Sequence, residues 1–265
     1  MKIGFIGLGN MAAAMIGGML GKGLAGPEDI IGSARTEATR EKIRKQYAIT
    51  TVQENQQVAG EAEVLFLAVK PTVMSEVIDE IREIVPGGSI VVSIAAGRDL
   101  NFLSRAFGRE DLKIIRCMPN TPALVSEGCT GVSPGRGVGA GDLEKVVKLM
   151  ESFGKAIVVP ERLMNAVVGV SGSAPAYVFL FIEAMADGAV AAGMPRKQAY
   201  EFAAQAVLGS AKMVLETGIH PGELKDMVCS PGGTTIQAVK VLEEMGMRAA
   251  VMDAVAACVE KAEGM

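Results

Sequence analysis

The most constraining feature of this sequence is a glycine pattern directly after its first apolar segment. Residues 2–7 have the composition of a β-strand, and Gly7-Leu8-Gly9-Asn10-Met11-Ala12 leads into an apolar helical segment that continues to about Gly21. In such a strand–turn–helix unit the first glycine permits a tight turn, the second admits a pyrophosphate, and a small third residue lets helix and strand pack. Free amides and the positive dipole at the helix N-terminus attract the phosphates. The pattern predicts dinucleotide binding, against the alternative of a glycine turn without a ligand.

Strands and helices alternate over the first 160 residues. Apolar runs at 29–32, 64–69, 90–94, 113–116 and 156–160 indicate further strands, and segments 37–47 and 73–85 have helical patterns. Strands that are apolar throughout are typical of a parallel sheet covered on both faces. Strand–helix alternation indicates βαβ units. We therefore predict an α/β fold, with a Rossmann-type, mainly parallel sheet in a dinucleotide-binding domain at 1–160.

The strand signal stops after Pro160, and residues 161–265 are predicted to be a C-terminal all-helical domain. We expect helices at about 173–193, 196–218 and 234–264, with Ser173 as the N-cap of the first, and Gly/Pro breaks between them. These helices are rich in Ala, Val and Met, and about 100 residues cannot hide so much apolar surface in one small domain. A homodimer formed through them is the expected solution.

Composition and charge exclude several classes of function. A formal net charge of −4 argues against a nucleic-acid binder, and a single histidine excludes a His-rich metal site, so no metal is expected. The four cysteines form no CxxC pair and no signal peptide precedes the first strand, which favours reduced thiols in a cytoplasmic protein. Segment 164–182 carries no charge, but its polar residues and Pro175 make a membrane span the less favoured interpretation.

The end of the second strand bears on the choice of nicotinamide cofactor. An NAD site usually places a carboxylate there, on the ribose hydroxyls. This chain instead has Ser33, Arg35 and Thr36, with no carboxylate before Glu37. A guanidinium and hydroxyls suit a 2′-phosphate, so NADPH is favoured, while NADH stays open. The alternative is that Arg35 is an ordinary solvated side chain.

Two further groups of residues suggest ligand contacts. Segments 68–71, 94–97 and 118–122 follow strands, at the sheet edge where doubly wound folds bind ligands. In the helical half, Ser230-Pro231-Gly232-Gly233-Thr234-Thr235 forms a glycine turn before the last helix. Its free amides and hydroxyls could hold a small carboxylate. A simple helix cap is the alternative.

These segments occur in the order found in one enzyme family. The motifs GLGNM at 7–11, AVKP at 68–71, MPNTP at 118–122, SGSAPAY at 171–177 and HPGELKD…SPGGTT at 220–235 make the whole chain resemble pyrroline-5-carboxylate reductase. The resemblance implies a Rossmann domain followed by a helical dimerisation domain, with dimers that often assemble further, commonly into decamers. It also implies reduction of 1-pyrroline-5-carboxylate to L-proline by NAD(P)H, the last step of proline biosynthesis.

The resemblance also assigns site residues. The substrate carboxylate is expected on the amides of Gly233, Thr234 and Thr235, with the Thr235 hydroxyl facing the ring nitrogen as the catalytic group. Met227 stands where the family often has an asparagine, so no cofactor contact is assigned to it. The expected cofactor contacts are Ile6, Gly7, Leu8, Gly9, Asn10, Met11, Ser33, Arg35, Asn55, Ala68, Val69, Lys70, Pro71 and Ala95.

Two other functions are weighed. A β-hydroxyacid dehydrogenase of the 6-phosphogluconate type also joins a Rossmann domain to helices, but it needs a catalytic lysine early in the first long helix. Here residues 177–182 are apolar and the next lysine is Lys197, so an alcohol oxidation would lack its acid–base group. A non-catalytic NADP-binding regulatory protein is the second alternative, and the intact SPGGTT turn speaks against it.

Overall fold

The computed structural model describes residues 1–264, which form two compact units. The sheet unit comprises Met1–Ser173 and the C-terminal segment from Cys258, and the helical unit comprises Ala174–Ala257. This division follows contacts in space and separates the units at Ser173. The domain boundary at residue 160 therefore stays a prediction about the sequence.

An eight-stranded sheet organises the sheet unit, in the order β3-β2-β1-β4-β5-β6-β7-β8. All neighbouring strands are parallel except the β6–β7 pair, so the mainly parallel α/β fold is confirmed. The order reverses between β1 and β4, and doubly wound sheets bind ligands outside the strand ends at such a point. The strands are β1 (Ile3–Ile6), β2 (Ile30–Ser33), β3 (Thr50–Val52), β4 (Val64–Leu67), β5 (Ile90–Ser93), β6 (Lys113–Met118), β7 (Gly128–Pro134) and β8 (Gly154–Val158).

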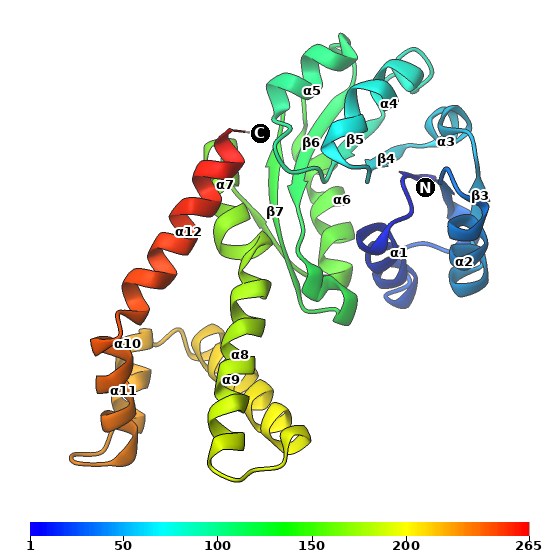
Figure 1. The fold of residues 1–265 in the computed structure, drawn as a ribbon. Coiled ribbons are helices and arrows are strands. Elements are labelled where there is room, and N and C mark those ends of the chain that lie inside the picture. The colour runs from blue at the N-terminus through cyan, green and yellow to red at the C-terminus, as the bar shows by residue number, and fades with distance from the viewer. Residues whose placement is uncertain (265) are drawn as a thin grey trace. The chain divides into compact units, whose positions relative to one another are not determined.

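Helices cover both faces of this sheet, as Figure 1 shows. On one face α1 (Asn10–Gly21), α2 (Glu37–Tyr47) and α6 (Ala140–Met150) supply side chains to a core that contains Phe5 and Phe66, whose rings stack 4.7 Å apart. On the other face α3 (Asn55–Glu61), α4 (Met74–Ile81) and α5 (Leu100–Phe107) build a second core around Leu65 and Val91. Burial on both faces explains why β1 and β4 carry no polar side chain and why β5 is apolar up to its last residue, Ser93.

The sequence patterns leave two strands and several helices unnoticed. β3 is a short polar strand at the sheet edge, and β7 is rich in Gly, Thr and Ser although it lies between β6 and β8. Neither segment contains the continuous apolar run that indicates a buried strand. β7 pairs with β6 in the antiparallel direction, and β8 then pairs with β7 in parallel. These two strands extend the sheet beyond β6, the last strand of its parallel part.

The helical unit contains α8 (Ala174–Ala191), α9 (Arg196–Thr217), α10 (Pro221–Val228), α11 (Thr234–Glu244) and most of α12 (Met247–Glu263). Helix α8 packs against α9, and the two lie side by side in Figure 1. The single helix expected at 234–264 is wrong, because the chain breaks it at Gly246. That glycine has φ +74°, a left-handed conformation that ends a helix.

Ser173 directly precedes α8, but its backbone is helical (φ −97°, ψ −27°) and not extended, so the expected N-cap is not formed. Helical structure runs through it from Glu161, by way of α7 (Met164–Val167) and a π-helical turn at Val168–Gly172, into α8. The Ser173 hydroxyl instead lies 3.0 Å from the Cys258 sulfur, which joins this turn to the end of α12 within the sheet unit. The helical stretch Glu161–Ala191 is long and apolar enough to cross a membrane by length and composition, and 11% of its most apolar window is buried.

Candidate functional site

The predicted dinucleotide turn lies where the sheet order reverses. Gly7 follows β1 with φ +95°, and a Cβ at this position would stand 2.5 Å from the Ala68 carbonyl oxygen. The Gly7 amide donates to the Ser33 carbonyl at 3.0 Å, and the Ala68 amide donates to the Ile6 carbonyl at 2.8 Å. The turn is thus held by both neighbouring strands, and only glycine fits its conformation and its space.

The backbone beside Gly9 is open. Gly9 precedes the first residue of α1 with extended backbone, no side chain caps the helix N-terminus, and a Cβ at Gly9 would meet no atom within 4 Å. Gly9 and Asn10 are exposed, while Ala12 is buried against the sheet. The free amides, the helix dipole and this open space fit a pyrophosphate. The residues present therefore fit a dinucleotide, which the sequence pattern predicted.

Two neighbouring strand ends contribute the next expected residues. Ala68, Val69, Lys70 and Pro71 follow β4, and Pro71 begins a 3-10 turn that leads into α4. Ala95 follows β5 and is buried. β1, β4 and β5 are adjacent and parallel, so these segments and the glycine turn share the carboxyl edge of the sheet. The structure thus brings the predicted cofactor residues of the first, fourth and fifth strands to one edge.

The end of β2 is organised around Asn55. The Ser33 hydroxyl, which is fully buried, donates to Asn55 Oδ1 at 2.7 Å. Asn55 Nδ2 in turn donates to Glu80 Oε2 at 2.8 Å. Asn55 itself is part-exposed. Ser33 and Asn55 are brought together as expected for one site, whereas Glu80, on α4, was not predicted from the sequence.

The side chain of Arg35, which lies at the same end of β2, is largely exposed. Its guanidinium lies 3.5 Å from Glu76 of α4, and both side chains are about three-quarters exposed, at 74% and 73%. The nearby Arg40 is buried and holds the loop, donating to the Ala34 carbonyl at 2.6 Å and to Glu37. Arg35 is therefore the exposed guanidinium of this region, and Arg40 is a structural one.

The MPNTP segment has a structural role that the sequence did not reveal. Asn120 is nearly buried, and its amide donates to the Ser171 carbonyl and hydroxyl at 3.1 and 3.2 Å. Its Oδ1 accepts from the Cys129 amide at 2.8 Å, and Ser171 Oγ donates to the Cys129 carbonyl. Asn120 thus fastens the end of β6 to β7 and to the π-helical turn.

The SPGGTT segment forms the expected turn within the helical unit. Gly232 has φ +70°, and the Gly233 amide donates to the Ser230 carbonyl at 3.0 Å. A Cβ at Gly233 would collide with the Ser230 hydroxyl oxygen. Thr234 begins α11, and no side chain caps that helix. Of the three amides expected to hold a carboxylate, that of Gly233 is already engaged by the Ser230 carbonyl. The Thr234 and Thr235 amides lie at an open helix N-terminus, a favourable place for a carboxylate.

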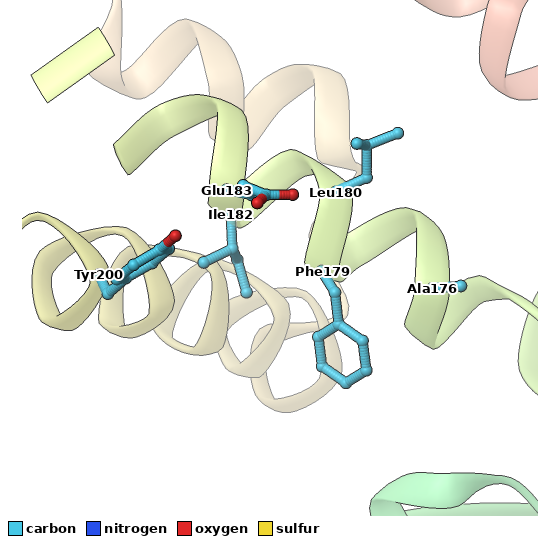
Figure 2. Close-up of a pocket in the computed structure, with 6 residues that line it drawn as sticks. All are labelled: Ala176, Phe179, Leu180, Ile182, Glu183 and Tyr200. Carbon is cyan, nitrogen blue, oxygen red and sulfur yellow. The ribbon is translucent and has the colours of Figure 1, made fainter. Parts of the chain in front are cut away.

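An open hollow lies on the surface of the helical unit, between α8 and α9. It has a volume of about 550 Å³ and is lined by apolar side chains with Glu183 at its edge, as Figure 2 shows. None of the predicted cofactor or substrate residues lines it. The lining residues are Ala176, Phe179, Leu180, Ile182, Glu183 and Tyr200.

The described residues contain no cluster of three or more His, Cys, Asp or Glu side chains that could hold a metal ion. All four cysteines are free thiols. Burial raises the pKa of the Cys117 thiol far above its usual range, so this group stays protonated within the core. The Cys117 thiol is therefore not available as a nucleophile.

Comparison with known proteins identifies the family of the chain. The family model described as pyrroline-5-carboxylate reductase dimerisation matches residues 161–265, and a model described as NADP oxidoreductase, coenzyme F420-dependent, matches residues 2–97. Pyrroline-5-carboxylate reductase from Escherichia coli (strain K12) is 55% identical over 262 residues, which cover 99% of this chain and 97% of the relative.

Solved structures agree with the sequence match. A pyrroline-5-carboxylate reductase from Coxiella burnetii superposes with a TM-score of 0.92 and 34% identity, over 99% of this chain and 97% of the other. A pyrroline carboxylate reductase from Plasmodium falciparum with NADP bound gives a TM-score of 0.90 and 30% identity over the same shares of both chains. With the dinucleotide turn, the SPGGTT turn and a full-length relative at 55% identity, the chain belongs to the pyrroline-5-carboxylate reductase family.

Proposed function

We propose that this chain reduces 1-pyrroline-5-carboxylate to L-proline, using NADPH with NADH as a second donor, as the last step of proline biosynthesis. The observation that carries this proposal is the 55% identity to the Escherichia coli enzyme over nearly the full length of both chains. The open glycine turn after β1 supports the cofactor, because its geometry fits a pyrophosphate.

The cofactor is assigned to the carboxyl edge of the sheet. Leu8 to Met11 would hold the pyrophosphate through backbone amides, and Gly7, whose amide is bonded to the Ser33 carbonyl, would shape the turn. Arg35 would meet the 2′-phosphate, and Ala68 to Pro71 with Ala95 would line the nicotinamide side. Ser33 is buried beneath Asn55, so its part in this proposal is to hold the Asn55 amide. When bound, NADPH supplies the hydride that reduces the imine carbon.

The substrate is assigned to the SPGGTT turn. The amides of Thr234 and Thr235 would bind the carboxylate, while the Gly233 amide holds the turn through its bond to the Ser230 carbonyl. The Thr235 hydroxyl would face the ring nitrogen and donate a hydrogen bond there. A cyclic imine is already electrophilic, so the residues chiefly need to orient the ring and exclude water. This role agrees with a turn whose functional atoms are backbone amides and hydroxyls.

We further propose that the chain acts as a homodimer that can assemble into larger oligomers such as decamers. The match of residues 161–265 to a dimerisation model supports self-association. So does the exposed apolar surface of α8 and α9, which includes Phe179, Leu180 and Phe202 at 63–68% exposure. The same contact would cover the apolar stretch Glu161–Ala191. Four free thiols favour a cytoplasmic location.

A turnover assay tests the activity. Purified protein is mixed with NADPH and 1-pyrroline-5-carboxylate, and both the loss of NADPH absorbance and the formation of proline are measured, then repeated with NADH. We expect one proline for each NADPH oxidised. Protein that binds NADPH but shows no imine-dependent oxidation would contradict the proposal and favour a regulatory NADP-binding protein.

A substitution tests the cofactor assignment. Arg35→Ala should weaken NADPH binding about tenfold and leave NADH nearly unchanged, because one charge-assisted bond to the 2′-phosphate is lost. The lower end of the usual range is expected, since Arg35 is exposed and has Glu76 as a competing partner. Equal losses for both cofactors, measured by calorimetry, would show that Arg35 does not contact the phosphate.

A further inference from the structure

The hydrogen bonds around Asn55 leave one orientation for its amide. Oδ1 can only accept, so the Ser33 hydroxyl must be the donor in the 2.7 Å bond. The Glu80 carboxylate can only accept, so Nδ2 must face it at 2.8 Å. A flipped amide would set its oxygen against the carboxylate. Glu80 therefore fixes which way Asn55 presents its remaining N–H and its remaining lone pair.

This amide stands beside the position where a dinucleotide-binding sheet contacts the adenine ribose. Doubly wound folds place that contact at the end of the second strand, and Ser33 is the last residue of β2. Asn55 is the first residue of α3, bonded directly to Ser33, and it is part-exposed. Its free N–H and lone pair are thus available at the ribose.

Helix α4 directs two carboxylates toward this same point. Glu76 and Glu80 lie one helical turn apart, and they contact Arg35 and Asn55. The charged side chains that these ion pairs and hydrogen bonds link around the end of β2 are Arg35, Arg40 and Arg44 with Glu37, Glu76 and Glu80, and Arg44 is paired with Glu37. Arg40 is already paired with Glu37 and the backbone. The region offers a 2′-phosphate the exposed guanidinium of Arg35, which already faces Glu76, and a second carboxylate, that of Glu80. Its electrostatic preference for that phosphate is therefore weak.

We propose that Glu80 is a positioning residue that sets the cofactor preference of this site. It orients Asn55 toward the ribose, and its negative charge lowers the affinity for a 2′-phosphorylated dinucleotide relative to one with a free 2′-hydroxyl. The inference rests on the proposed function, because it concerns the cofactor of the same reaction. It adds a residue of α4 that lies outside the glycine turn and outside the residues assigned by resemblance.

Two substitutions separate the two effects of Glu80. Glu80→Gln removes the charge but keeps an acceptor for Asn55 Nδ2, whereas Glu80→Ala removes both. Asp79→Asn is the matched control, since Asp79 lies next to Glu80 on the same helix, loses the same charge and is 69% exposed beside Arg82. The dissociation constants of NADP⁺ and NAD⁺ are measured by calorimetry on the full chain, at low and high salt, with melting temperatures alongside.

The expected result has two parts. Glu80→Gln should raise the preference for NADP⁺ over NAD⁺ by about three- to tenfold at low salt, and less at high salt, while Asp79→Asn leaves it unchanged. Glu80→Ala should bind both dinucleotides more weakly than Glu80→Gln does, because the Asn55 amide is no longer held. Equal melting temperatures of the two variants would exclude a difference in folding.

Several outcomes overturn the inference. An unchanged preference in Glu80→Gln, or a change as large in Asp79→Asn, would show that the charge of Glu80 is not felt at the 2′ position. Equal binding by Glu80→Gln and Glu80→Ala would show that Asn55 needs no positioning. Failure of the unmodified chain to bind either dinucleotide would instead contradict the proposed function, so the two failures are distinguishable.

Discussion

The two units of the molecule differ in the burial of their large apolar side chains, which are mostly buried in the sheet unit and mostly exposed in the helical unit. In the sheet unit Phe66 is fully buried and stacks on Phe5 between the strands and α1. In the helical unit Phe179 is 63% exposed and Phe202 is 67% exposed, and the buried residues of α8 and α9 are alanines. A single chain therefore completes the core of the first unit but leaves the second without a partner for its apolar faces.

This difference indicates that the two units obtain the free energy of apolar burial from different sources. Burying a large apolar side chain contributes about 1.5–3 kcal/mol, a gain that the sheet unit obtains from its own residues. The helical unit can obtain it from a second copy, and the dimerisation model that matches residues 161–265 agrees with this. The predictions below test this contrast between the units.

The largest effect is expected from placing a charge on the exposed face of α8. Phe179→Asp should convert a dimer into single chains and remove nearly all activity, because an unpaired carboxylate would be buried in the interface. Light scattering and turnover are measured on the same sample. Ile84→Asp is the control, since Ile84 is a part-exposed apolar residue of the sheet unit. A Phe179→Asp variant that stays dimeric and active would show that the exposed face of α8 is not buried by a second copy.

The glycines of the dinucleotide turn separate folding from binding within the sheet unit. Gly7→Ala should lower both the melting temperature and the affinity for NADPH, the latter about a hundredfold or more, because the new Cβ meets the Ala68 carbonyl at φ +95°. Gly9→Ala should leave the melting temperature unchanged and lower only the affinity, because its Cβ enters open space. A lowered melting temperature in Gly9→Ala would show that the added Cβ does not enter open space, and this would contradict the proposed pyrophosphate site beside Gly9.

A smaller effect is expected at the turn of the helical unit. Thr235→Ala should lower kcat/KM for the imine by about tenfold to a hundredfold, at the lower end of acid or hydrogen-bond assistance, and leave NADPH affinity nearly unchanged. Thr235→Ser keeps the hydroxyl and should restore most of the activity. Full activity with a lowered melting temperature in Thr235→Ala would show that Thr235 only stabilises α11.

The smallest effect is a difference between thiols. Cys117 lies in β6 with no exposed surface, whereas Cys229 of the helical unit is part-exposed. Native protein should therefore be alkylated at Cys229 long before Cys117, as mass spectrometry of labelled peptides can show. Burial raises the pKa of the Cys117 thiol in the folded state above its value of about 8.5 in the unfolded chain. The stability that the buried, protonated thiol contributes is therefore present below about pH 8.5 and is lost as the pH rises above it. Rapid native labelling of Cys117 would contradict a closed sheet core.

The fold followed from the sequence wherever one physical signal dominated. Continuous apolar runs located β4 and β5, and the glycine turn located the start of α1. The strand β7 was missed because its burial comes from β6 and β8 on either side, and neighbours in space leave no mark on a Gly- and Thr-rich segment. The break between α11 and α12 depends on one glycine, Gly246, and an isolated glycine within a helical pattern is compatible with a continuous helix as well as with a helix end.

In the candidate site, the local turns could be predicted from the sequence, whereas contacts between residues far apart in the chain could not. Backbone features such as the turns at Gly7 and Gly233 depend on local sequence, so their positions could be predicted. Glu80 and Asn120 act through side chains that meet residues far along the chain, at Asn55 and at Ser171. Only the packing of α4, and of the π-helical turn, brings these pairs together.

The contact between Ser173 and Cys258 makes the helical unit an insertion within the sheet unit. For a flexible segment of roughly a hundred residues, bringing the two ends together costs on the order of 4 kcal/mol, and here the sheet unit holds both ends. The segment 258–264, which belongs to the first unit, is synthesised after the helical unit. The sheet unit therefore cannot be finished until the helical unit has been synthesised, and the two must mature together rather than in order along the chain.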